Sequence, residues 1–179
     1  MPVISVYGSG DPAPGSEAYA TAREVGRVLA ALGYAVANGG YGGTMEASAR
    51  GAREVGGHTI GVPCRIWSSS PRREVLSEVH MTDSYEERLA TLIALGSGGY
   101  VVLPGATGTL VELAWVWEQA CKGFLDVARQ PIACLGGFWQ PLVDMMVSQR
   151  RRSVDAVHVV TDPGALAEVF PAVDAAPGR

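Results

Sequence analysis

Short apolar runs alternate along this chain with longer segments in which apolar residues recur at helical spacing. The apolar runs predict strands at residues 3–7, 34–37, 58–62, 100–103, 131–135 and 157–160. The helical spacing predicts helices at residues 16–32, 44–55, 83–95, 109–122, 139–150 and 163–170. Such alternation is typical of a mostly parallel sheet with helices on both faces. We therefore predict an α/β fold with three layers and a doubly wound sheet.

One domain is expected to account for nearly the whole chain. Its 179 residues and 18.7 kDa suit a single α/β unit, and no internal repeat or linker divides them. We expect the domain to span residues 1–170 and a loose tail to follow at residues 171–179. Residues 64–77 are polar and irregular, which predicts a long loop.

Composition narrows the range of partners. Apolar residues make up 47% of the chain and charged residues 18%, which predicts a compact fold. The net charge of -4 argues against a nucleic-acid polymer or a membrane surface as partner. The basic run at residues 150–152 closes a predicted helix, where cations are favourable.

The expected compartment is the cytoplasm. The three cysteines are widely spaced and odd in number, which suits a reducing environment. No signal peptide precedes the first predicted strand, and no apolar run is long enough to cross a membrane.

Glycine-rich loops follow three of the predicted strands, at the sheet edge where such folds bind ligands. The first, Gly8-Ser9-Gly10, could contact a phosphate or ribose, but it lacks a full dinucleotide-binding fingerprint and is weak alone. The second, N-G-G-Y-G-G-T-M-E at residues 38–46, has four glycines in five positions. A turn needs fewer, so we interpret this loop as a close approach of backbone to ligand.

The third loop carries the strongest signal. The sequence L-P-G-A-T-G-T-L-V-E at residues 103–112 reads as the end of a strand, a tight loop and the start of a helix. Free amides and the positive dipole end of a new helix favour an anion at that point. Glu112 then lies about one turn inside the helix and could face whatever the loop binds.

Two further charged residues have open roles. Arg88 lies near the start of the predicted helix 83–95 and could reach the same sheet edge. Its neighbours Glu86 and Glu87 favour a surface ion pair instead. Glu78 directly precedes a short, mainly apolar segment at residues 79–81.

Other chemistries find little support in the sequence. Lys122 is the only lysine, and its place at a helix end excludes both a phosphate-binding lysine of the Walker type and a Schiff base. The three histidines lack the spacing of metal ligands, and no G-x-S-x-G motif supports a serine nucleophile. We expect no metal and no cofactor.

The aromatic residues are interpreted as packing residues. Trp67, in the irregular segment, could cover a ligand, but we favour a packing role. The others are assigned to the core or to a subunit interface: Trp115, Trp117, Phe138 and Trp139.

From the first strand to Phe170, the chain resembles the LOG ("lonely guy") family of Rossmann-like proteins, often labelled lysine decarboxylases. The hallmark P-G-G-x-G-T-x-x-E of that family appears as P-G-A-T-G-T-L-V-E at residues 104–112, with Ala106 at the second glycine. The arginine that precedes the hallmark matches Arg88, and an earlier ligand-contacting glutamate matches Glu78. The upstream glycine-rich loop of the family corresponds to Gly39, Gly40, Gly43 and Met45.

The resemblance implies an activity. LOG proteins hydrolyse the N-glycosidic bond of adenine-type nucleoside 5′-monophosphates, including cytokinin ribotides, and release ribose 5-phosphate. By resemblance, Arg88 and Glu112 are the catalytic residues and the chain forms a homodimer. The implied phosphate-binding residues are Gly105, Thr107, Gly108 and Thr109, and Ala106 is a further implied substrate-binding residue. Because a related branch of the superfamily carries molybdenum cofactor, a non-catalytic nucleotide- or cofactor-binding carrier is the alternative.

Overall fold

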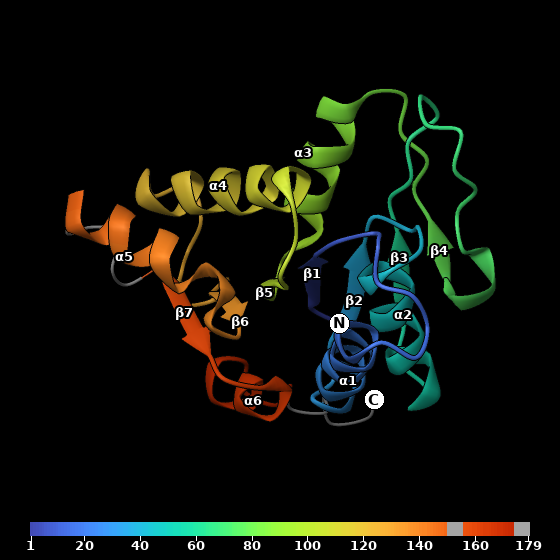
Figure 1. Ribbon diagram of the computed structural model, residues 1–179, viewed down its shortest axis with the longest axis horizontal. Coiled ribbons are helices and arrows are strands. Elements are labelled where there is room, and N and C mark those ends of the chain that lie inside the picture. The colour runs from blue at the N-terminus through green and yellow to red at the C-terminus, as the bar shows by residue number, and fades with distance from the viewer. Residues whose placement is uncertain (150–155, 174–179) are drawn as a thin grey trace, which may run out of the picture.

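Seven parallel strands form one sheet in the computed structural model, which describes residues 1–149 and 156–173 (Figure 1). The strand order is β4-β3-β2-β1-β5-β6-β7. The strands are β1 (Val3–Tyr7), β2 (Ala35–Asn38), β3 (Thr59–Gly61), β4 (Glu78–Val79), β5 (Gly99–Val102), β6 (Ile132–Leu135) and β7 (Val157–Val160). The predicted α/β architecture with a parallel sheet is confirmed.

Helices cover both faces of this sheet, as Figure 1 shows. The helices are α1 (Glu17–Ala31), α2 (Thr44–Glu54), α3 (Tyr85–Leu95), α4 (Thr107–Cys121), α5 (Gln140–Gln149) and α6 (Leu166–Val169). Apolar side chains of α1, α2 and α6 form one core with the sheet. Those of α3, α4 and α5 form a second core on the opposite face. The three-layer arrangement follows because each strand of the sheet centre is buried on both sides.

The strand order reverses between β1 and β5. Strand β1 pairs with β2 on one side and with β5 on the other, both in parallel. From β1 the chain first moves outward to β4 and then returns to β5 on the far side of β1. The loops that leave β1 and β5 therefore diverge at a topological switch point, where open α/β sheets bind their ligands.

Helix starts follow local capping chemistry. The Ser16 side chain accepts a hydrogen bond from the Tyr19 amide at 3.2 Å and so begins α1. The Ser84 side chain accepts from the Glu87 amide at 3.1 Å and begins α3. These serines end the preceding loops within one or two residues of the predicted helix boundaries.

Several predicted elements differ from the structure. The short step after residue 77 is a strand, β4, which two residues were too few to reveal in the pattern. Helix α4 begins at Thr107, two residues earlier than predicted. The predicted helix 163–170 is a 3₁₀ turn at Pro163–Ala165 followed by the short α6, because Asp162 caps a tight turn. The basic run 150–152 lies outside the described residues.

The first residues of the expected tail pack on the domain. The Tyr34 hydroxyl donates to the Pro171 carbonyl at 2.8 Å, and the Val173 amide donates to the Leu32 carbonyl at 2.8 Å. The Val173 side chain also packs against the core that contains α1. The prediction of a loose tail from residue 171 is therefore wrong for residues 171–173.

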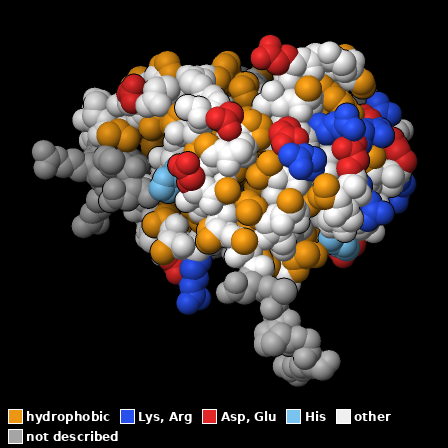
Figure 2. Space-filling view, turned by 90° about the horizontal axis from the view of Figure 1, so that it is seen from below, with side chains coloured by type: hydrophobic (Ala, Val, Ile, Leu, Met, Phe, Trp, Pro, Cys, Tyr) orange, Lys and Arg blue, Asp and Glu red, His pale blue; other side chains and the backbone are white. Residues whose placement is uncertain are grey.

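Charges on the surface of α1 and α2 alternate in sign. Figure 2 shows blue and red side chains next to one another at the right of the view. An ion pair of 2.7 Å joins Arg23 of α1 to Glu54 of α2, and one of 2.8 Å joins Arg50 to Glu46 within α2. Within the described ranges, no helix combines the length and apolar character that a bilayer crossing requires.

Candidate functional site

A cavity of about 640 Å³ opens at the switch point of the sheet. Loops after β1, β2 and β5 contribute to it, together with the segment after β3 and the first turns of α3 and α4. Its volume falls in the range of small-molecule sites. The lining residues named in the sequence prediction are Gly8, Ser9, Gly39, Met45, Arg88, Ala106, Gly108, Thr109 and Glu112.

Arg88 lies at the inward face of α3, close to its beginning. The buried residues of that helix are Arg88, Leu89, Leu92 and Ile93, so Arg88 occupies the inward position nearest the sheet rim. Only 5% of its surface is exposed. The guanidinium donates from Nε to the Val62 carbonyl at 2.9 Å and from Nη1 to Oε1 of Glu112 at 3.4 Å.

The surface ion pair considered for Arg88 does not form. The Glu87 carboxylate instead accepts a hydrogen bond from the Asp83 amide at 2.7 Å and helps to cap α3. Arg88 points to the other side of the helix, where Glu112 is its partner. The structure thus joins the two residues that the LOG resemblance named as catalytic, although they are separated by 24 positions.

Glu112 lies on the inward face of α4, in register with apolar core residues. It is 7% exposed and shares this face with Thr109, Leu113, Val116 and Trp117. Burial raises the pKa of Glu112 to about 7, and Arg88 opposes that rise through its charge and hydrogen bond. A carboxyl group with such a pKa can take up or release a proton near neutral pH.

The N-terminus of α4 faces the same cavity. Ala106 precedes the helix in an extended conformation, and among the described residues no side chain caps this end. The first amides of the 15-residue helix have no capping side chain, and Ala106, Gly108 and Thr109 at this end line the cavity, which favours an anion there. Gly108 and Thr109 line the cavity, whereas Gly105 and Thr107 do not. Gly105 has a steric role, since a Cβ there would lie 2.2 Å from Oγ1 of Thr109.

The second glycine-rich loop serves mainly to pack against its neighbours. Gly43 has a φ of 67°, and a Cβ on it would lie 2.4 Å from the backbone carbon of Gly10 in the first loop. Gly39 lines the cavity, and a Cβ there would lie 1.9 Å from Nη2 of Arg88. Gly40 and Gly43 do not reach the cavity. From this loop, Gly39, Tyr41 and Met45 line the cavity and could contact a ligand.

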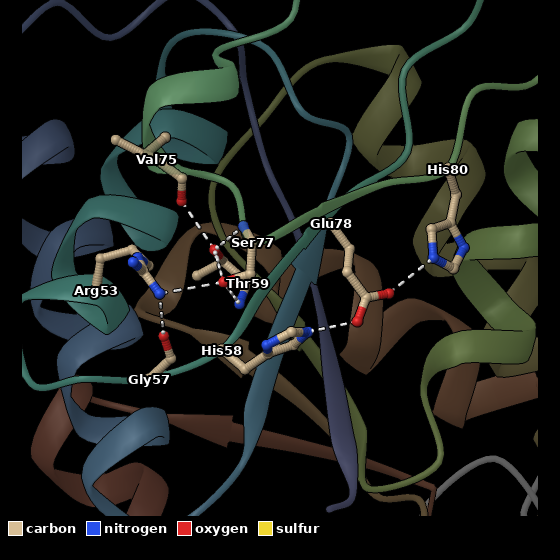
Figure 3. A network of polar contacts seen from close by, with 8 residues as sticks. All are labelled: Arg53, Gly57, His58, Thr59, Val75, Ser77, Glu78 and His80. Carbon is tan, nitrogen blue, oxygen red and sulfur yellow. Dashed lines mark hydrogen bonds and ion pairs between the residues drawn. The ribbon is translucent and has the colours of Figure 1, made fainter.

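Glu78 lies away from the cavity. It is half exposed on the edge strand β4, between two histidines (Figure 3). Its carboxylate oxygens lie 2.8 Å from Nε2 of His58 and 3.1 Å from Nε2 of His80. This geometry does not support the predicted substrate contact at Glu78. Its side chain contacts His58 and His80 at the edge strand and does not line the cavity.

Aromatic residues that the sequence analysis did not assign to the site form part of the cavity. Tyr41, Trp67 and Tyr85 line it, and the Trp67 ring contacts both tyrosine rings at centroid distances of 5.6 and 5.8 Å. The Arg88 guanidinium carbon lies 4.9 Å from the centre of the Trp67 ring. Trp67 thus packs against other side chains, as predicted, and it also lines the cavity. Its place in an irregular, polar segment with no periodicity hid this contact.

Tyr7, the last residue of β1, is the other large residue missed by the pattern. It lines the cavity, and it is 1% exposed because its ring stacks on Tyr100 at 6.1 Å. Burial and then the Glu112 carboxylate raise the pKa of Tyr7 well above its usual value. Its hydroxyl therefore stays protonated at neutral pH. An aromatic residue directly before Gly8 was the available signal.

The remaining candidates lie elsewhere. Lys122 follows the last turn of α4 and pairs with Glu118 at 3.4 Å, beside a different surface cavity. Across the part of the chain that the structure describes, no three potential metal-ligating side chains come together. Trp117 and Trp139 are buried in the core, whereas Trp115 and Phe138 are exposed.

Comparison with known proteins places this site in a family context. The profile of the SLOG cluster4 family matches residues 1–167. A Mycobacterium tuberculosis protein named cytokinin riboside 5′-monophosphate phosphoribohydrolase is 33% identical over 131 residues, which are 72% of this chain and 67% of that protein.

Two solved structures are also similar. The molybdenum cofactor carrier protein of Chlamydomonas reinhardtii has a TM-score of 0.69 and 26% identity, over 94% of this chain and 96% of its own. The molybdenum cofactor binding protein of Rippkaea orientalis has a TM-score of 0.74 and 21% identity, over 94% of both chains, and supports the fold alone. From the match over residues 1–167, the chain belongs to the SLOG cluster4 family, which confirms the LOG-type resemblance of its sequence.

Proposed function

We propose that this protein hydrolyses the N-glycosidic bond of a nucleoside 5′-monophosphate and releases the free base and ribose 5-phosphate. The observation that carries the proposal is the buried Arg88–Glu112 pair in a cavity that also contains the uncapped start of α4. A mycobacterial relative is named for the same reaction on cytokinin riboside 5′-monophosphate. AMP is the simplest substrate of this chemical class.

The phosphate would lie at the start of α4. Ser9, Gly108 and Thr109 line the cavity there, and the backbone amides of Gly108 and Thr109 would donate hydrogen bonds to the phosphate. The Ser9 hydroxyl donates to the Asp11 carboxylate at 3.0 Å. Binding the non-reacting phosphate would fix the ribose and orient its anomeric carbon toward Glu112.

Glu112 would supply the chemistry. Cleavage of the C–N bond builds positive charge on the ribose ring, which a carboxylate stabilises. The same carboxylate can accept a proton from the attacking water, since its pKa of about 7 is matched to neutral pH. The charge of Arg88 favours the ionised form of Glu112. The Arg88 Nε donates a hydrogen bond to the Val62 carbonyl and is therefore not free for a ligand. We assign Arg88 to orienting and charging Glu112 rather than to holding phosphate.

The alternative function is a non-catalytic carrier of molybdenum cofactor. The 26% identical carrier protein of Chlamydomonas reinhardtii supports it. The phosphate of a pterin cofactor would suit the same helix start, and an aromatic wall would suit its rings. This alternative does not require a carboxyl group that titrates near neutral pH, which is why we favour hydrolysis.

A second copy of the chain is the proposed protein partner. Exposed apolar side chains on α4 and α5 include Val111 and Trp115 on one helix and Met145 and Met146 on the other. Such patches are typical of protein–protein contacts. Sedimentation at increasing concentration measures this association.

The decisive experiment incubates the purified protein with AMP and measures free adenine and ribose 5-phosphate. We expect both products in equal amounts, and we expect Glu112→Gln to abolish release while AMP still binds. The matched control is Glu118→Gln, which changes an exposed residue two turns along the same helix. Binding of AMP without product by the unmodified protein would refute the hydrolase, and a pterin that co-purifies would favour the carrier.

A further inference from the structure

The cavity combines two surfaces of different chemistry. One surface consists of backbone and small polar groups from Gly8, Ser9, Ala106, Gly108 and Thr109. The other consists of large apolar and aromatic side chains, namely Tyr41, Ile66, Trp67 and Tyr85. A ligand that fills both needs an anionic end and a flat apolar end.

Trp67 is the centre of the aromatic surface. Its side chain is 38% exposed although it contacts three other residues, so part of the indole remains open to the cavity. The Tyr41 and Tyr85 rings meet it at interplanar angles of 63° and 56° and therefore do not stack flat on it. The neighbouring Ile66 is 60% exposed and extends this surface.

The position of Trp67 is fixed by its segment. The Tyr41 hydroxyl donates to the Cys64 carbonyl at 3.0 Å and accepts from the Cys64 amide at 2.8 Å. The Arg65 amide donates to the Thr82 carbonyl at 2.9 Å, which ties the segment to the chain before α3. The hydrogen bonds of Cys64 and Arg65 thus fix the residues directly before Trp67, although the segment contains no long regular element.

From these contacts we infer that Trp67 forms the base-binding wall of the cavity and also holds Arg88 in place. This inference rests on the proposed function and adds a specificity residue to it. Flat aromatic bases stack on aromatic side chains, and a guanidinium packs over the indole ring through a cation–π contact. The indole therefore links recognition of the base to the position of the arginine that charges Glu112.

Comparing the affinities for ribose 5-phosphate and for AMP distinguishes this role from a general effect on folding. Ribose 5-phosphate carries the anionic end and lacks the base, so Trp67→Ala should leave its affinity unchanged. The affinity for AMP should fall about 10-fold or more in the same variant, which is the scale of one lost base–aromatic stack. Trp67→Phe keeps an aromatic ring and should retain most of the AMP affinity. Phe124→Ala, which removes an exposed aromatic ring outside this cavity, is the control and should change neither.

Calorimetric titration with AMP and with ribose 5-phosphate tests the inference, with every protein also carrying Glu112→Gln so that AMP binds without being hydrolysed. A selective loss of AMP affinity in Trp67→Ala, rescued in Trp67→Phe, supports it. An unchanged ratio of the two affinities in Trp67→Ala overturns the inference and leaves the proposed function intact. Failure of the Glu112→Gln protein itself to bind either ligand overturns the proposed function and this inference together.

Discussion

Replacing Arg88 by methionine should shift the pH dependence of the reaction. Among the described residues, Arg88 lowers the pKa of Glu112, and burial outweighs this effect so that the pKa is about 7 with Arg88 present. Without the guanidinium, the carboxyl group should hold its proton to a higher pH. Activity that needs the carboxylate should then appear only in more alkaline solution.

The expected size of this shift follows from the distance between the charges. At 3.4 Å and an effective dielectric constant of about 20, two unit charges attract by about 5 kcal/mol. That energy corresponds to an upper bound of about 3.5 pKa units, and shifts beside an opposite charge are commonly about 1–3 units. The acid limb of activity should therefore move from about pH 7 to about pH 8–10. At pH 7 the ionised fraction of Glu112 should fall from about one half to about one tenth or less.

Initial rates of adenine release at saturating AMP, measured from pH 5 to pH 10, give this midpoint. The phosphate of AMP titrates identically with both proteins, so a difference in midpoint belongs to the enzyme. Arg88→Lys is the control, because it keeps a positive charge and should keep the midpoint close to that of the unmodified protein. A methionine variant that loses rate equally at every pH, with its midpoint unchanged, would refute the role of Arg88 in charging Glu112.

Two further predictions follow from the same site. Because the folded pKa of Glu112 lies above its ordinary value of 4.5, the folded state should lose stability as pH rises from 4.5 to about 7, by up to about 3 kcal/mol. Glu112→Gln removes this loss, so the melting temperature of the variant, relative to that of the unmodified protein, should rise between pH 4.5 and pH 8. An equal difference in melting temperature at both pH values would contradict a buried carboxyl group that titrates in this range. Gly39→Ala would place a Cβ 1.9 Å from Nη2 of Arg88. It should lower kcat/KM about 100-fold with the melting temperature nearly unchanged, whereas Gly137→Ala, where a Cβ meets nothing within 4 Å, should retain activity.

The fold was largely predictable because hydrophobic periodicity reports burial directly. Strands β1 and β7 lie at the predicted residues, since both are short, mainly apolar runs that end at Gly or polar residues. Strand β4 was missed because two residues cannot display a period. The packed residues after Phe170 were missed because the bonds from Tyr34 to Pro171 and from Val173 to Leu32 join distant parts of the chain.

The inward positions of Glu112 and Arg88 could be predicted from the spacing of apolar residues along their helices. Glu112 precedes Leu113 on the inward face of α4, and Arg88 precedes Leu89 on that of α3, so amphipathic spacing alone could have turned both inward. The contact of Trp67 with Arg88 depends on the path of an irregular loop, which no local pattern encodes. The substrate contact predicted for Glu78 came from the resemblance, whereas in the structure Glu78 is absent from the cavity lining and its side chain contacts two histidines.

A crystal structure of Glu112→Gln bound to AMP tests the central claim most directly. The account predicts the phosphate at the amides of Gly108 and Thr109, with the anomeric carbon within about 3–4 Å of the side chain at position 112. A phosphate bound away from the start of α4, or a ribose turned away from position 112, would contradict it.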